Sequence, residues 1–157
     1  MLPALTGLPI RVELRPSLGP HLAATAISRR LILLDSQVLT RTAEFERILI
    51  HELFHFAWVR LGNPRRGSWQ DLLASEIAHR TPGELGWSSE WRKSKLRVAD
   101  PGGRTPAWRR YACESFCDSA AWLWSGLRRH EEFTLPPAAR KARKEWLQRE
   151  FSAGVNV

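Results

Sequence analysis

The sequence has little that would hold it in a membrane or carry it across one. Its longest apolar stretches are interrupted by charged residues and fall well short of the roughly 20 consecutive apolar residues that span a bilayer. The N-terminus, MLPALTGLPIRVELRP, lacks a basic segment leading into an apolar run, and it lacks a small-residue cleavage site. We therefore expect a cytoplasmic protein without a membrane partner.

Cysteine is also scarce, with only Cys113 and Cys117 in a chain of 157 residues. In a helical pattern these two side chains leave the same helix face, where a disulfide between them would need poor geometry. A zinc ribbon would need a second cysteine pair, which the chain lacks. We expect two reduced and buried thiols, as is usual in a reducing compartment.

Acidic residues are outnumbered, since 24 Lys and Arg against 16 Asp and Glu give a net charge of +8. This balance raises the hypothesis of a nucleic-acid partner. The basic residues are spread along the chain, however, with one concentration at 140–144 and no recognised nucleic-acid module. Most of them are expected on solvated helix faces, and nucleic-acid binding stays an alternative that no motif supports.

Apolar residues are well represented and predict a folded α+β protein. They make up 43% of the chain, including eight tryptophans, and the length suits one domain over residues 1–157. Alternating apolar and polar residues at 8–15 predict a half-buried strand, and 30–35 predicts a second, more buried strand of the same small sheet. This sheet region covers 1–40, and a mostly helical part follows it.

The helical part is predicted to have four segments. They are an active-site helix within 41–62, an insert over 63–107, a helix over 108–126 and a basic amphipathic helix over 137–152. Thr40 or Thr42 is expected to cap the first helix. Within the insert we expect a helix from Ser68 to Ala78, a short helix beginning at 87, and a loop over 100–106.

The stretch His51-Glu52-Leu53-Phe54-His55 carries the chemistry of the first helix. Positions four apart share a helix face, so His51 and His55 can offer two imidazoles to one metal ion. Glu52 follows the first ligand directly, where its carboxylate can reach a metal-bound water. The other residues from 48 to 57 are uncharged, as in a buried helix. The stretch predicts a Zn²⁺ site.

A catalytic zinc site needs a third protein ligand. The other histidines do not stand at the short spacing that would supply it: His21, His79 and His130. We therefore expect a carboxylate from a later helix, and Glu76 and Glu114 are the two candidates. Asp118 lies one helical turn after Glu114, where it can accept the free N–H of a zinc-bound histidine and fix its tautomer.

The motif His51-Glu52-x-x-His55, with the later Glu114-x-x-x-Asp118, resembles that of the gluzincin metallopeptidases, the thermolysin-type clan. The small size, and a strand and capping threonines ahead of the motif helix, resemble compact minigluzincins of the ImmA/IrrE type. The resemblance covers residues 30–60 and 108–125, and the long insert between them departs from it.

This resemblance implies a zincin-like fold with His51, His55 and Glu114 as ligands. By the same resemblance Glu52 is the general base and Asp118 orients a ligand. The strand at 31–35 would lie beside the cleft and pair with an extended peptide or protein substrate.

The implied chemistry is hydrolysis by zinc-activated water, whose pKa falls to about 7 on the metal. Glu52 would accept the proton of this water and deliver it to the leaving amine. The developing oxyanion needs a further donor. Tyr111, the only tyrosine, is expected near the same helix face as Glu114 and is one candidate for this donor. His79 and Arg110 are the alternatives.

Two other functions remain open at this stage. The zinc site could be closed and stabilise a regulatory or binding protein without peptidase activity, with the tryptophans and the insert forming a partner surface. Alternatively, the net charge and the 140–144 concentration could serve a nucleic-acid-associated protein. The sequence does not indicate an oligomeric state.

Overall fold

The computed structural model describes residues 1–157, except for the side chain of residue 43. The strands are β1 (Leu5–Thr6), β2 (Arg11–Arg15), β3 (Ala23–Ala26), β4 (Leu31–Asp35) and β5 (Val155–Asn156), and η1 (Ile27–Arg29) and η2 (Ser36–Thr40) are short 3₁₀ helices. The α-helices are α1 (Thr42–Arg60), α2 (Asn63–Ala78), α3 (Trp87–Lys93), α4 (Asp100–Gly103), α5 (Pro106–Trp124) and α6 (Pro137–Glu150).

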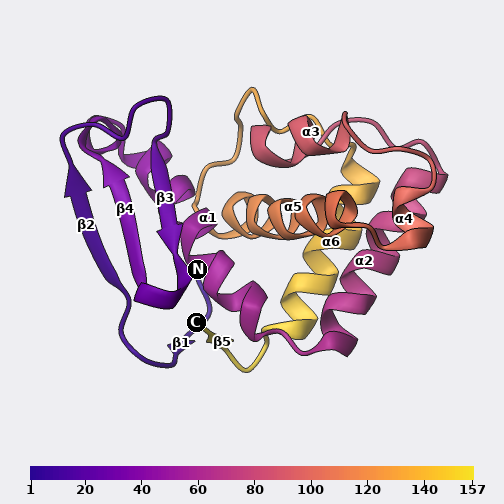
Figure 1. The fold of residues 1–157 in the computed structure, drawn as a ribbon, viewed down its shortest axis with the longest axis horizontal. Helices are drawn as coiled ribbons and strands as arrows, with labels where there is room; N and C mark the ends of the chain where they lie inside the picture. Colours follow the sequence, from indigo (N-terminus) through magenta and orange to yellow (C-terminus); the bar gives the residue numbers. More distant parts are fainter.

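These elements form an α+β structure with the sheet at one side and the helices at the other (Figure 1). Helix α1 lies between the sheet and α5, and α5 runs through the middle of the helical part. The short strands β1 and β5 pair in parallel and bring the two chain ends close together. None of the described helices combines the length and the apolar character needed to cross a membrane.

The larger sheet has the order β2-β4-β3. The predicted buried strand is present as β4, which pairs in parallel with β2 and antiparallel with β3. The strand predicted over 8–15 begins only at Arg11 and is largely exposed rather than half-buried. Strand β3 was not predicted, because its small residues Ala23-Ala24-Thr25-Ala26 lack an apolar alternation.

This strand order shows that β4, the strand expected to pair with a substrate, is not available for pairing. Both edges of β4 are already hydrogen-bonded, so β4 cannot add a further strand. The strand at the sheet edge next to α1 is β3, and the hydroxyl of Thr25 donates to the backbone oxygen of Glu52 in α1. An extended ligand beside the motif helix would therefore meet β3.

An aromatic core joins α1 to the later helices. Phe54 of α1 lies 5.6 Å from Phe116 of α5 between ring centroids, and both side chains are fully buried. Trp69 of α2 and Trp146 of α6 also pack on Phe116. Each such ring removes enough apolar surface from water to contribute about 1.5–3 kcal/mol. The core thereby fixes how α1 and α5 face each other.

Three expectations about helix ends and loops are wrong. Neither threonine caps α1, since its N-cap is Arg41 and no side chain bonds there. Helix α2 begins at Asn63 rather than Ser68. This start accommodates Pro64 in the first turn of the helix, where its missing backbone N–H loses no intrahelical hydrogen bond. The loop expected over 100–106 contains α4 instead.

One residue of the basic 140–144 stretch is buried rather than solvated. The guanidinium of Arg143 lies 2.6 Å from Glu76 Oε2 and 2.7 Å from Glu84 Oε2, and Arg143 and Glu84 are fully buried. Lys93 and Tyr111 approach the same Glu84 carboxylate. Burial opposes ionisation of Glu84, but the charge of Arg143 outweighs it and lowers the pKa of Glu84 to about 2. This network ties α2, α5 and α6 to the segment before α3.

The network predicts the effect of Glu84→Gln on stability. Removing one partner of a buried ion pair costs about 3–5 kcal/mol, so urea unfolding at pH 7 should show a loss of that order. Because the pKa of Glu84 is lowered on folding, its stabilisation is complete above its unfolded pKa of about 4.3. The difference between the two proteins should therefore shrink as the pH falls from about 4 towards 2.

Glu145→Gln is the matched control, since Glu145 lies on α6 in an exposed pair with Lys141. It should unfold like the unmodified protein at every pH. A Glu84→Gln protein as stable as this control at pH 7 would contradict the assignment.

Candidate metal centre

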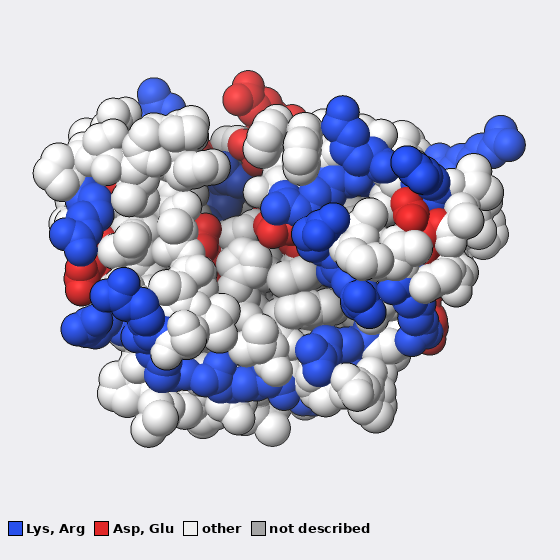
Figure 2. All heavy atoms as spheres, in the orientation of Figure 1, with Lys and Arg blue, Asp and Glu red and all other residues white. Residues whose placement is uncertain are grey.

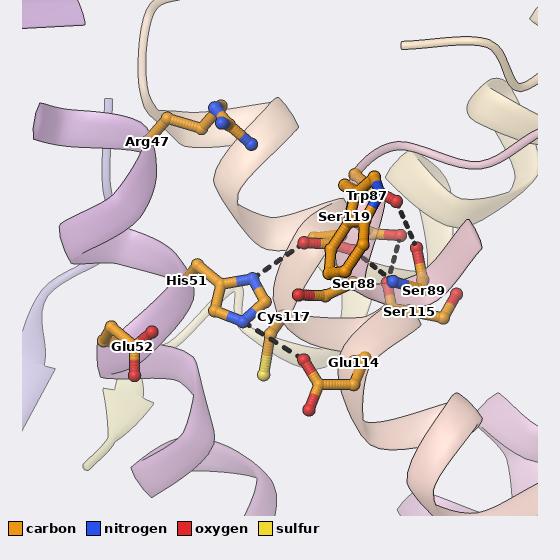
Figure 3. Close-up of polar contacts among 12 residues, drawn as sticks. Arg47, His51, Glu52, Trp87, Ser88, Ser89, Glu114, Ser115, Cys117 and Ser119 are labelled. Carbon is orange, nitrogen blue, oxygen red and sulfur yellow. Dashed lines mark hydrogen bonds and ion pairs between the residues drawn. The ribbon is translucent and has the colours of Figure 1, made fainter. Parts of the chain in front are cut away.

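The imidazole of His51 on α1 points towards Glu114 on α5 (Figure 3). His51 lies between two carboxylates, with Nδ1 2.7 Å from Asp118 Oδ1 and Nε2 3.3 Å from Glu114 Oε2. The same Glu114 oxygen lies 4.0 Å from His55 Nε2. Glu114 Oε2 therefore lies within 4.0 Å of both Nε2 atoms, and His51, Glu52 and His55 form a group that could hold a metal ion, with ligand atoms within 4.8 Å of one another.

These distances suit a zinc ion. A tetrahedral ion with ligand bonds of about 2.0–2.2 Å separates its ligand atoms by about 3.3–3.5 Å. The His51–Glu114 separation of 3.3 Å already has this value, and the His55–Glu114 separation of 4.0 Å exceeds it by about half an ångström. A small rotation of one side chain would bring His55 into range.

The electrostatics of this group favour a cation. Burial opposes protonation of His51, but Asp118, with Glu114 and Glu52, raises the pKa of His51 well above its usual value. Glu114 is half-buried and Asp118 is buried, which by itself raises a carboxyl pKa, yet His51 lowers the pKa of both. Two ionised carboxylates thus lie against His51, where a positive charge is stabilised.

Asp118 is held in place by the N-terminus of α3. The Ser89 N–H donates to Asp118 Oδ2 at 3.0 Å, leaving Oδ1 for His51. Gly86 lies so close that a Cβ there would be 2.2 Å from Asp118 Cγ. Only glycine permits this approach, so the insert over 63–107 supplies part of the site.

Glu52 lies on the other side of His51, towards the sheet (Figure 3). Its Oε2 accepts a hydrogen bond of 2.6 Å from the hydroxyl of Thr25 in β3. A cleft of about 290 Å³ opens here, with Ala23 at the β3 side and Trp87 at the α3 side. Figure 2 shows this hollow between the two halves of the molecule, with acidic atoms at its edges. Space for a ligand therefore adjoins the motif residues.

Glu76, the other expected ligand, does not face the two histidines. Both of its carboxylate oxygens accept hydrogen bonds from the Arg143 guanidinium, at 3.0 and 2.6 Å. Glu114 instead has Oε2 towards His51 and Oε1 at 3.2 Å from Arg92 of α3. Sequence reasoning missed Arg92, because no local pattern links α3 to α5.

The oxyanion role expected for Tyr111 does not fit its position. Its side chain is fully buried and its hydroxyl donates to Glu84 at 2.6 Å, within the Arg143 network. Burial, with the negative charge of Glu84, raises the pKa of Tyr111 well above its usual value. The alternative oxyanion donors do not fit this role either. His79 is hydrogen-bonded to the Ser75 backbone oxygen at the end of α2, and Arg110 is exposed.

Sequence reasoning also missed that both cysteines lie beside His55. Cys113 Sγ and Cys117 Sγ are each 3.5 Å from His55 Nδ1, and both thiols are free. A hydrogen bond with Cys117, helped by His55, lowers the pKa of Cys113 to about 6 although burial opposes this. The buried group of two thiols and one imidazole could hold a metal ion. The sequence did hold a sign of this group, because Cys113 directly precedes Glu114 and Cys117 directly precedes Asp118.

The geometry thus brings two candidate ligand sets to one pair of helices, sharing His55. No protein family, curated protein or solved structure matches this chain. The function is therefore inferred from the residues of the site.

The close approach of Gly86 to Asp118 predicts that Gly86→Ala is destabilising. The added methyl group would overlap a buried carboxylate, and overpacking of this kind costs about 1–3 kcal/mol. The measurement is the free energy of urea unfolding. Gly102→Ala is the control, because a Cβ at Gly102 meets no atom within 4 Å. Equal stability of the two variants would show that α3 does not hold Asp118 as described.

Proposed function

We propose that this chain is a zinc-dependent metallopeptidase with a zincin-like fold, in which His51, His55 and Glu114 bind the zinc ion. The observation that carries the proposal is the approach of Glu114 Oε2 to Nε2 of His51 and to Nε2 of His55, with Asp118 on the other nitrogen of His51. The gluzincin resemblance of the sequence supports the same ligand set. Glu114 is preferred over Glu76, which is engaged by buried Arg143.

Asp118 orients the first ligand. By accepting a hydrogen bond from Nδ1–H, it keeps the lone pair of His51 on Nε2, which faces Glu114 and His55. The Ser89 N–H binds the second oxygen of Asp118, so the carboxylate cannot rotate freely. The imidazole is thereby positioned before any ion arrives.

Glu52 is the general base and then the general acid of the proposed reaction. Zinc, when bound, would polarise the substrate carbonyl and lower the pKa of a bound water to about 7. Glu52 accepts the proton released by the attacking water and passes it to the leaving nitrogen. The hydroxyl of Thr25 donates to Oε2 of Glu52, which leaves Oε1 for the proton.

An extended peptide is the substrate that fits the cleft. Strand β3 lies at the sheet edge beside α1, and an edge strand can pair with a peptide backbone. The cleft runs past Glu52 and His51 to Trp87, an exposed side chain of α3. A substrate on β3 would therefore present its backbone to the proposed base.

The competing nucleic-acid hypothesis loses part of its support. Arg143 belongs to the 140–144 concentration but is buried between two carboxylates. On the face drawn in Figure 2, Lys and Arg are spread over both halves of the molecule. We therefore place the peptidase first.

The decisive test is Glu52→Gln. The variant should bind zinc as the unmodified protein does, because Glu52 is not a proposed ligand, but peptide hydrolysis should fall by about 10²–10⁴-fold. Metal content and cleavage of a mixed peptide library are the measurements. Glu46→Gln is the control, since Glu46 is exposed on the same helix. Equal activity of the Glu52 variant and the control would refute the mechanism, and zinc binding without any cleavage would favour a zinc-stabilised binding protein.

Asp118→Asn tests the orienting role. Loss of a carboxylate partner of a zinc-bound histidine lowers metal affinity by about 10–100-fold. The measurement is competition for zinc with a chromophoric chelator. Asp71→Asn serves as the control, because Asp71 is an exposed residue paired only with Arg104. Unchanged zinc affinity in the Asp118 variant would remove Asp118 from the site.

A further inference from the structure

The imidazole of His55 has a ligand-type atom near each of its nitrogens. Nε2 lies 4.0 Å from Glu114 Oε2, on the side of His51. Nδ1 lies 3.5 Å from Cys113 Sγ and 3.5 Å from Cys117 Sγ. The proposed zinc ligation uses only Nε2, so it leaves the sulfur side of this ring without a role.

We propose that Cys113, Cys117 and Nδ1 of His55 form a second metal site, for a thiophilic cation of the class of Cu⁺ and Cd²⁺. We further propose that this site and the His51–His55–Glu114 site are alternatives, because both need His55. The exclusion rests on the proposed function, whereas the sulfur site does not.

The distances suit coordination without rearrangement of the backbone. With the bond lengths of zinc, about 2.3 Å to sulfur and about 2.0 Å to nitrogen, a tetrahedral ion separates sulfur from nitrogen by about 3.5 Å, and a larger ion such as Cd²⁺ needs slightly more. Both sulfur–nitrogen distances are 3.5 Å. Cysteines four apart on α5 cannot easily form a disulfide, but they can offer two sulfurs to one ion on the same helix face.

The surroundings select the class of ion. Cys117 is fully buried and Cys113 is half-buried, so strongly hydrated hard cations are disfavoured there. Two sulfurs and one imidazole are ligands that soft ions prefer over oxygen-binding ions such as Mg²⁺. A cavity of about 290 Å³, with Thr25, Glu52, His55 and Cys113 in its wall, gives access from the surface. A fourth ligand from solvent could enter by the same route.

The two sites exclude each other because a neutral imidazole has one lone pair. Binding a soft ion at Nδ1 places the proton of His55 on Nε2, on the side of Glu114 Oε2. Binding zinc at Nε2 places the proton on Nδ1, between the two sulfurs. Occupation of the sulfur site would therefore withdraw one ligand from the proposed catalytic zinc.

The sulfur site is tested by titrating the metal-free full chain with Cd²⁺ and recording the ultraviolet charge-transfer band of cadmium thiolates. The chain has only two cysteines, so the band reports on this site alone. We expect saturation at one equivalent, an unchanged band in Glu114→Gln, and at least tenfold weaker binding in His55→Ala. No band in the unmodified protein, or unchanged affinity in His55→Ala, would overturn the proposal.

Variants of the cysteines separate the two thiols. Cys113→Ser, at the less buried position, should lose about half of the band and at least tenfold in Cd²⁺ affinity. Full affinity in this variant would overturn the two-sulfur site. The cadmium titration of the unmodified protein already tests for the sulfur site. Poor folding of a Cys117 variant would therefore not leave the proposal untested.

Exclusion is tested by adding Zn²⁺ to the cadmium-loaded chain and measuring both metals by mass spectrometry after desalting. One ion per chain, with zinc displacing cadmium as the thiolate band falls, is the expected result. The same zinc addition to Glu114→Gln, which lacks a ligand of the proposed catalytic site, should displace less cadmium, and equal displacement would show that zinc competes at the sulfurs themselves. One zinc and one cadmium per chain with the full band would overturn exclusion. Zinc binding to a Cys113→Ser/Cys117→Ser protein tests the proposed catalytic site separately, since its failure there would leave the cadmium result standing.

Discussion

The buried ion pairs of Arg143 hold the helical part of the molecule together. A guanidinium removed from water costs several kcal/mol unless charged partners surround it. Arg143 finds them in Glu76 of α2 and Glu84 of the segment before α3, both far away in sequence. Helices α2 and α6 and the start of α3 are thereby held in one arrangement around α5.

The network also sets the position of the candidate metal centre, because Glu84 lies two residues before Gly86. Gly86 touches Asp118, and the Ser89 N–H binds it, so the same segment holds the carboxylate that orients His51. Helix α5 is the common support, and its faces serve different partners. Tyr111, Ser115 and Ser119 face the Arg143 network, Glu114 and Asp118 face His51, and Cys113 and Cys117 face His55.

This division of α5 explains why one imidazole meets two kinds of ligand. His55 lies where the carboxylate face and the sulfur face adjoin, so its tautomer decides which face can bind a metal ion. Zinc accepts both oxygen and sulfur ligands, whereas a softer ion favours sulfur. The proposed peptidase would then respond to thiophilic metals through a ligand that it already uses. A thiophilic metal would withdraw His55 but not His51 from the zinc, because Asp118 holds the tautomer of His51.

Local periodicity was sufficient to predict part of the fold and of the candidate site. The helices expected over 41–62, 108–126 and 137–152 are present as α1, α5 and α6, and the four-residue spacings of His51 with His55 and of Glu114 with Asp118 place each pair on one helix face. The partners of these residues depend on how the elements pack. It directed Glu76 to Arg143 and Glu114 to His51, buried Tyr111 against Glu84, paired both edges of β4, and set two thiols against His55. These contacts join elements far apart along the chain, and a buried charge takes whichever counter-charge the packing brings near it, which no local pattern records.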